Sequence, residues 1–328
     1  MRLRSLTNRS ALVLLAGSIM LTGCSNDGAA SSSRGTGAAH SQRDPVRALR
    51  SALAGGSRGT SFYLSLGDSL SQGVQPTATG QDVVTNRGYP DQLVTTLHKH
   101  LRRLHLIKLG CSGETTESMI QGGICHYPAG SQLTQAARFL RTHRGRTALI
   151  TIDIGANDPN SCIDGGMTDI LPCIVGRLPE IDKNLDRILA TLRAAGGKRV
   201  LIVGMTYYVP ELALWKRGTP GRQIGILTGA VAAGANKMLT DSYQRYGARV
   251  ANVFAAFRTR DFGRKKGQAS STTTPKVSKP GAVPPNVARI CSLTWMCASA
   301  PRGPDEHAND AGYRVIARTF WHAIAVAP

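Results

Sequence analysis

The sequence has no C-x-x-C pair among its cysteines and no suitably paired histidine, which argues against a zinc site. It also has no G-x-S-x-G elbow at a predicted strand end, which argues against the α/β-hydrolase fold. Aromatic residues make up only 5% of the chain, and few of them lie near the scattered basic residues. Nucleic-acid binding is therefore a weak interpretation, and no nucleic-acid partner is expected.

Acidic residues are scarce as well. The chain has 20 Asp and Glu against 40 Lys and Arg, for a formal net charge of +20. This excess favours peripheral attraction to anionic membrane lipids, cell-wall polymers or acidic glycans, although a GC-rich genome would also enrich arginine. With 328 residues, 41% of them apolar, the chain is long enough for a sizeable core, and we expect a monomer.

A long apolar run lies at the N-terminus. Basic residues without any acid precede the apolar residues 11–21, a pattern typical of an export signal and too short for a membrane span. The run ends in Leu-Thr-Gly-Cys24, which resembles a bacterial lipobox, whose cysteine becomes lipidated. We predict a signal peptide over residues 1–24 and a lipid anchor at the outer face of the bacterial cytoplasmic membrane. The alternative is a plain secretory signal and a secreted protein.

The six cysteines after Cys24 are an even number in a chain predicted to be exported, which indicates a disulfide framework. Many connectivities are possible in principle, but the six fall into three close pairs along the chain. We predict bonds of Cys111 with Cys125, Cys162 with Cys173, and Cys291 with Cys297. Each bond would close a short loop and contribute about 3 kcal/mol or less in the chain-entropy model.

Two segments have low-complexity composition. Residues 25–60 are rich in Gly, Ser, Ala and Arg without periodicity, so we expect a disordered linker between the anchor and a folded domain over residues 61–328. Residues 264–285 combine lysines, serines, threonines and prolines, and we expect a long exposed loop inside that domain.

Short apolar runs alternate with helical patterns through the rest of the chain. The runs have the character of buried parallel strands: Ser61–Leu66, Leu104–Leu109, Ala148–Ile154, Arg199–Val203 and Arg249–Val253. The helical segments are Pro90–Leu104, Leu133–Leu140, Leu178–Ala195, Gln223–Tyr246 and Ala311–Ala325. This alternation predicts a three-layer α/β/α, doubly wound, flavodoxin-like sheet of about five parallel strands, with active groups on the loops after the strands.

Chemically capable residues follow several of these strands. Gly-Asp-Ser69 follows the first strand, residues 110–116 follow the second, and Gly-Ala-Asn157-Asp follows the third. Asp-Glu-His307 lies just before the last helix. A Gly-Asp-Ser turn alone is more often only a turn. Together, however, a serine, a histidine with a nearby acid, a flexible glycine amide and an asparagine are what acyl transfer requires.

In order and spacing these four blocks resemble the SGNH (GDSL-type) hydrolases over residues 62–320. The resemblance implies a carboxylic ester hydrolase, a lipase or esterase without metal or organic cofactor, with Ser69 as nucleophile and His307 as base. It also implies an oxyanion hole formed by the backbone amides of Ser69 and Gly113 and the side-chain amide of Asn157. The three cysteine pairs look like those of secreted actinobacterial lipases and esterases in this family.

The acid partner of His307 departs from the family pattern. The usual aspartate lies three residues before the histidine, where this chain has Pro304. Asp305 gives an Asp-x-His variant and is our candidate for the acid. The alternative is a backbone carbonyl from residues 291–304 that orients the imidazole.

Two other functions are compatible with parts of this pattern. An O-deacetylase or acyltransferase acting on cell-surface glycan would use the same residues, and the sequence does not rank water against a sugar as acceptor. A non-catalytic surface-binding lipoprotein on a hydrolase scaffold belongs to another class. The presence of all four blocks argues against it.

Mass spectrometry of the mature N-terminus tests the predicted anchor. We expect the first residue to be Cys24 carrying a lipid, and we expect the protein to remain with the membrane fraction. Replacement of Cys24 by Ala should release it. An unmodified N-terminus beyond residue 24 would contradict the lipoprotein prediction and leave the plain secretory signal.

Overall fold

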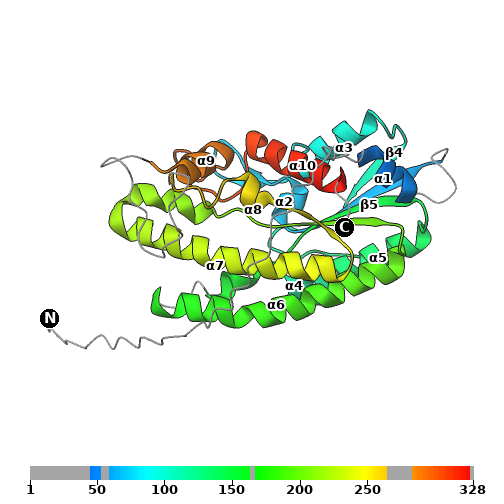
Figure 1. The fold of residues 1–328 in the computed structure, drawn as a ribbon, viewed down its shortest axis with the longest axis horizontal. Helices are drawn as coiled ribbons and strands as arrows, with labels where there is room; N and C mark the ends of the chain where they lie inside the picture. The colour runs from blue at the N-terminus through cyan, green and yellow to red at the C-terminus, as the bar shows by residue number, and fades with distance from the viewer. Residues whose placement is uncertain (1–44, 53–58, 163–166, 264–282, 326–328) are drawn as a thin grey trace, which may run out of the picture. The chain divides into compact units, whose positions relative to one another are not determined.

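A five-stranded parallel sheet forms the centre of the computed structural model, which describes residues 45–52, 59–162, 167–263 and 283–325 (Figure 1). The strands are β1 (Ser61–Gly67), β4 (Leu104–Lys108), β5 (Thr147–Asp153), β6 (Leu201–Met205) and β7 (Arg249–Ala251). Their order is β4-β1-β5-β6-β7, and every pair is parallel. All residues of β5 are buried, which is why this strand reads as a continuous apolar run. The predicted doubly wound α/β/α fold is confirmed.

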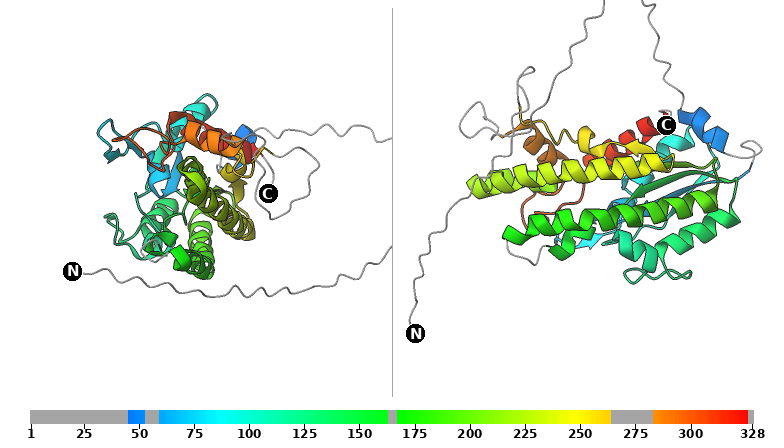
Figure 2. Two further views of the ribbon diagram at one scale, coloured as in Figure 1. Left: turned by 90° about the vertical axis from the view of Figure 1, so that its left-hand side faces the viewer. Right: turned by 60° about the horizontal axis from the view of Figure 1, so that its bottom comes forward.

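Helices cover both faces of the sheet (Figures 1 and 2). On one face lie α1 (Pro45–Ala52), α3 (Tyr89–His98), α8 (Val253–Ala256), α9 (Pro285–Leu293) and α10 (Asp310–Ala325). On the other lie α4 (Thr116–Gln121), α5 (Gln132–Thr142), α6 (Met167–Gly196) and α7 (Gly218–Arg245). Alternate side chains of β1 enter the two cores, Tyr63 the first and Leu64 the second. None of the helices in the described ranges is both long and apolar enough to cross a membrane.

Several short elements lie between these helices and strands. They are α2 (Ser69–Gln72), the antiparallel hairpin of β2 (Gln75–Pro76) and β3 (Asp82–Val83), η1 (Asp158–Cys162) and η2 (Pro210–Arg217). The sequence patterns did not predict the hairpin, because two paired residues on each side are too few to show a period. It is nevertheless part of the site described below.

The three predicted disulfides are confirmed. Cys111 bonds Cys125, Cys162 bonds Cys173 and Cys291 bonds Cys297, with Cα–Cα distances of 6.0, 5.7 and 5.0 Å. The first closes the loop after β4, and the third closes the segment from α9 toward the last helix. Two of the three loops therefore border the segments that carry the predicted site residues.

Helix α1 corrects the predicted disorder of residues 25–60. Val46, Leu49 and Ala52 recur at a spacing of three, which places them on one side of a helix, and all three are at most 4% exposed. The helix packs against α10 and β5. Burial of this apolar stripe is what orders the segment. The remainder of the predicted linker, Cys24 with its signal peptide, and most of the predicted 264–285 loop lie outside the described residues.

A substitution in α1 tests whether this helix belongs to the folded domain. Leu49 is fully buried, so Leu49→Ala should lower the free energy of unfolding by about 2–5 kcal/mol. Arg47 on the exposed side of the same helix provides the control, and Arg47→Ala should change it by less than about 0.5 kcal/mol. Urea unfolding followed by circular dichroism measures both. Equal, negligible effects would mean that α1 does not contribute to the fold.

Candidate active site

Ser69 begins α2, directly after β1. The turn requires Gly67, which has φ of +129°, because a Cβ atom there would lie 1.9 Å from the backbone oxygen of Asp153. Asp68 caps the helix, its Oδ1 accepting from the N–H of Leu70 at 2.9 Å. The side chain of Ser69 is half-buried, and its hydroxyl forms no hydrogen bond with any other residue that the structure describes. The hydroxyl is therefore available to a substrate or to a base.

Two buried carboxyl groups, those of Asp68 and Asp153, form hydrogen bonds around this turn. Asp68 Oδ2 accepts from the hydroxyl of Tyr207 at 2.9 Å, and Asp153 accepts from the N–H of Ser71 at 3.1 Å and from the hydroxyl of Tyr89. Burial raises the pKa of both, and the negative charge of Asp68 raises that of Asp153 further. The pKa of Asp153 is raised more strongly than that of Asp68, so Asp153 is the first of the pair to take up a proton.

Gln132, which the sequence analysis missed, fixes the end of β1. Its Oε1 accepts from the N–H of Gly67 at 2.7 Å, and its Nε2 donates to the backbone oxygen of Gly67 at 3.0 Å and to Glu114 Oε2 at 2.8 Å. The side chain is fully buried. One amide thus ties the strand before Ser69 to the loop that carries Gly113. No periodic pattern in the sequence marks such a contact between distant segments.

Each of the three predicted oxyanion donors keeps an N–H group that no other residue in the described part of the chain accepts from. Within the described ranges, the backbone N–H of Ser69 and that of Gly113 donate no hydrogen bond, and Gly113 is exposed with φ of +79°. Asn157 Nδ2 donates to the backbone oxygen of Glu114 at 3.0 Å, and its Oδ1 accepts from Asn160 at 3.3 Å. These contacts orient the amide and leave its second N–H available.

Further hydrogen bonds join the loops that carry these residues. Asp158 accepts from the N–H of Thr116 at 3.0 Å, which connects the loop after β5 to α4. Gln72 Nε2 donates to the backbone oxygen of Gly110 at 2.5 Å, and a Cβ atom on Gly110 would lie 1.7 Å from the hydroxyl of Ser71. The loops after β1, β4 and β5 therefore contact one another at the carboxyl ends of the strands, as predicted for this type of sheet.

His307 is held by Asp305. Its Nδ1 lies 3.1 and 3.3 Å from the two carboxylate oxygens, and its backbone N–H donates to Oδ1 at 2.9 Å. The histidine is 7% exposed. Among the described residues no backbone carbonyl forms a hydrogen bond with Nδ1, including those of residues 291–304. Of the two orienting groups considered from the sequence, the structure brings the carboxylate to the imidazole.

The acids around His307 control its protonation. Burial by itself lowers the pKa of the imidazole, but the hydrogen bond to Asp305 and the charges of Asp305, Glu306 and Asp82 outweigh burial and raise the pKa above its ordinary value. Asp305 shows the reciprocal effect: burial raises its pKa, and the contacts with His307 outweigh burial and lower it. The pair is therefore stabilised in its charged form.

Asp82 of β3 is a second acid that the sequence analysis missed. Its Oδ2 lies 3.9 Å from His307 Nδ1. Asp82, Asp305 and His307 each offer a ligand atom within 4.8 Å of the others, a spacing that would also suit a metal ion. A hydrogen bond already connects Asp305 with Nδ1 of His307, and we interpret the trio as a hydrogen-bonded arrangement.

Comparison with known proteins points to one family. The profile of a family described as the GDSL-like lipase/acylhydrolase family matches residues 65–315. No curated protein matches the chain.

Solved structures give distant likenesses. An acetylxylan esterase from Geobacillus stearothermophilus is 17% identical, with 82% of this chain and 96% of that chain covered and a TM-score of 0.46. An extracellular lipase from Streptomyces rimosus is 18% identical, with 71% and 99% covered and a TM-score of 0.43. A phospholipase A1 from Streptomyces albidoflavus is 17% identical, with 61% and 82% covered and a TM-score of 0.41. These likenesses are too remote to bear on the substrate.

The pH dependence of ester hydrolysis tests the pairing of Asp305 with His307. A base must be neutral to accept a proton. With His307 as the base predicted from the sequence, activity should rise with pH through the raised pKa of His307, above the ordinary value of 6.5. Asp305→Asn removes the charge that raises this pKa, so the midpoint should move to lower pH, while kcat/KM falls by about tenfold or more.

Asp241→Asn is the matched control, because Asp241 is a half-buried acid on α7 paired with Lys237. It should leave both the midpoint and kcat/KM unchanged. An unchanged midpoint in Asp305→Asn, with a loss well under tenfold, would mean that another group orients His307, either a backbone carbonyl or the nearby Asp82.

Proposed function

The chain belongs to the GDSL-like lipase/acylhydrolase family and is a carboxylic ester hydrolase, and we propose that it works through an acyl-enzyme on Ser69 with His307 as the base. The hydrogen bond between His307 Nδ1 and Asp305 carries this proposal. A carboxylate at Nδ1 holds the proton on that nitrogen, which leaves Nε2 as the acceptor for the serine proton. The free hydroxyl of Ser69 supports its role as nucleophile.

In the acylation step, Ser69 Oγ attacks the ester carbonyl carbon while its proton passes to His307 Nε2. The tetrahedral intermediate then expels the alcohol, whose oxygen takes the proton from the imidazolium. In the second step, water gives its proton to Nε2 and attacks the acyl carbon. Collapse of this intermediate returns the proton to Ser69 Oγ and releases the acid. Asp305 stabilises the imidazolium in both steps and is not itself protonated.

The oxyanion formed in each step needs donors that do not reorganise during the reaction. The backbone N–H groups of Ser69 and Gly113 and the second N–H of Asn157 are suited to this, because none of them is used by another described residue. The hydrogen bond from Asn157 to Glu114 limits rotation of the amide before substrate arrives. Loss of one such donor typically costs about 10²- to 10³-fold in turnover.

The location that we propose is outside the cytoplasm. Three disulfides suit an oxidising compartment, and the net charge of +20 suits a surface that carries anionic lipids or polymers. With a lipid on Cys24, the domain would act at the outer face of the membrane on lipid or acylated glycan esters. Without the lipid it would act as a secreted monomer.

Hydrolysis of p-nitrophenyl esters of increasing chain length, beside release of acetate from acetylated glycan, tests the proposal. Ser69→Ala should lower kcat by at least about a thousandfold on every ester that the wild type cleaves. The control is Ser292→Ala, at an exposed serine of α9, which should retain full activity.

The substrate series separates the remaining functions. A preference for long chains supports a lipase, activity on acetyl groups alone supports a deacetylase, and ester formation with an added sugar supports an acyltransferase. Wild-type activity in Ser69→Ala would overturn the proposed nucleophile. Absence of turnover by the wild type on all substrates would favour a binding protein.

A further inference from the structure

We propose that Asp82 is a second positioning carboxylate for His307, which supports Asp305 and takes its place at Nδ1 when Asp305 is removed. The inference rests on the proposed function, in which His307 is the base. Asp82 Oδ2 lies 3.9 Å from Nδ1, against 3.1 Å for Asp305 Oδ1. A small rotation of the carboxylate would bring Asp82 within hydrogen-bond distance once the nearer acid is absent.

Asp82 lies on the β2–β3 hairpin, and this hairpin is docked on the loop that carries His307. Gly80 at the turn has φ of +81°, and a Cβ atom there would lie 2.2 Å from the backbone oxygen of Pro301. Arg302 Nε donates to the backbone oxygen of Thr77 at 3.4 Å. The turn of the hairpin therefore touches the loop before Asp305 directly.

Gln75 makes a second connection between the two segments. Its Oε1 accepts from Trp295 Nε1 at 3.3 Å, and its Nε2 donates to Asp310 Oδ1 at 2.8 Å. The guanidinium of Arg302 also lies over the indole of Trp295, with its central carbon 5.1 Å from the ring centroid. Trp295 N donates in turn to the backbone oxygen of His307 at 3.1 Å. The hairpin and the histidine loop are thus linked through both side chains and backbone.

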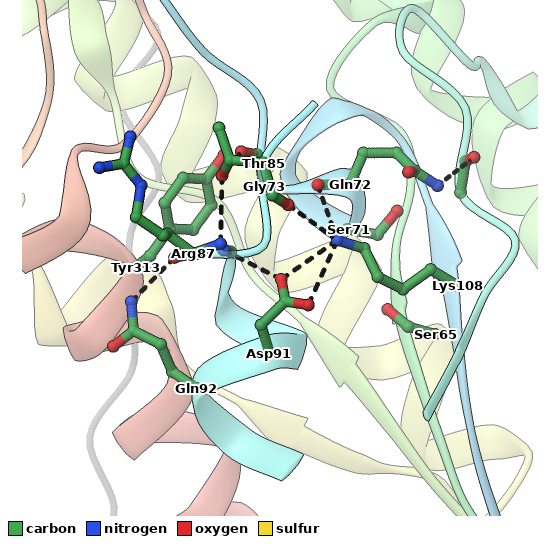
Figure 3. Close-up of polar contacts among 12 residues, drawn as sticks. Ser65, Ser71, Gln72, Gly73, Thr85, Arg87, Asp91, Gln92, Lys108 and Tyr313 are labelled. Carbon is green, nitrogen blue, oxygen red and sulfur yellow. Dashed lines mark hydrogen bonds and ion pairs between the residues drawn. The ribbon is translucent and has the colours of Figure 1, made fainter. Parts of the chain in front are cut away.

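The base of the hairpin is fixed by Lys108 at the end of β4 (Figure 3). Its Nζ donates to the backbone oxygens of Gln72 at 2.9 Å and Thr85 at 3.1 Å, and to Asp91 Oδ2 at 3.1 Å. The Thr85 hydroxyl donates to the backbone oxygen of Gly73 at 2.6 Å. Lys108 is 16% exposed, so this pair is shielded from solvent. Both ends of the hairpin are held, which sets the distance from Asp82 to the imidazole.

The charges around His307 decide how large the effect of Asp82 can be. Asp305 and Glu306 lie on the same loop, Asp68 lies at the nucleophile turn, and the hydroxyl of Tyr208 donates to the backbone oxygen of Glu306. Asp82 is 47% exposed, whereas Asp305 is 14% exposed. Solvent screens the more exposed acid, so its contribution should be small while Asp305 is present.

Removal of Asp305 changes this balance. The pKa of Asp82 is raised first by partial burial and then by the charge of Asp305, while the charge of His307 opposes both. Without Asp305 its share of this repulsion disappears, and Asp82 and Glu306 are left to stabilise the positive charge on the imidazolium. Substitutions of Asp82 and of Asp305 should therefore not have independent effects on activity.

A double-mutant cycle with Asp82→Asn and Asp305→Ala, which vacates the place of the carboxylate at Nδ1, tests the proposal through kcat/KM over a range of pH. Asp82→Asn should lower kcat/KM by about two- to fivefold, with little change in KM. It should also move the acid limb of the pH–activity profile, where kcat/KM rises with pH, to lower pH. The double variant should lose at least about tenfold more than the product of the two single losses. Asp82→Glu should restore the wild-type limb. Gln81→Ala, at the exposed neighbour on the hairpin, should have no effect.

Thermal unfolding of each variant separates misfolding from chemistry. The role of Asp82 would be overturned if the loss of kcat/KM in the double variant equals the product of the two single losses. It would also be overturned if Asp82→Asn leaves the acid limb of the pH–activity profile unchanged. Ser69→Ala distinguishes this failure from failure of the proposed function. If Ser69→Ala is inactive while the cycle is multiplicative, the acyl-enzyme proposal stands and only Asp82 is removed. If Ser69→Ala is active, the function itself is wrong.

Discussion

The close approach of β1 to β5 at Gly67 and Asp153 is the constraint on which the site depends. The two residues are paired in register, and the N–H of Asp68 donates to the backbone oxygen of Asp153 at 3.1 Å. Because a side chain at position 67 would occupy the space of that oxygen, the chain can turn here only at a glycine. The turn then places Ser69 at the carboxyl ends of the strands, where the loops after β4 and β5 begin.

This arrangement buries polar groups, and their hydrogen bonds explain why it is stable. Burial of Asp68 and Asp153 as two charges would be unfavourable. The raised pKa of Asp153 favours its protonated form, and the hydroxyls of Tyr89 and Tyr207 donate to the two carboxyl groups. Gln132 similarly uses both ends of its amide. Such a network has few alternative arrangements, so it fixes the backbone around Ser69 more closely than apolar packing would.

Much of this could be predicted from the sequence because the signals are local. The five strands are short and largely apolar, and the six cysteines after Cys24 pair with their neighbours in sequence. The contributions of Gln132 and Asp82 could not be predicted. Gln132 contacts Gly67 only after the sheet has formed. Asp82 approaches His307 only because a hairpin with two paired residues on each strand packs on a distant loop. Helix α1 was missed because its small residues resemble linker composition, although Leu49 is buried.

The charge of the whole chain is a poor guide to the charge of the site. Although Lys and Arg outnumber Asp and Glu two to one, the residues that surround His307 are acids: Asp305, Glu306 and Asp82. The field at the imidazole is set by these nearby groups, because more distant surface charges are screened within about 10 Å at ordinary salt. A basic exterior can therefore attract the protein to an anionic surface while the histidine keeps a raised pKa. The two properties depend on different residues and can change independently.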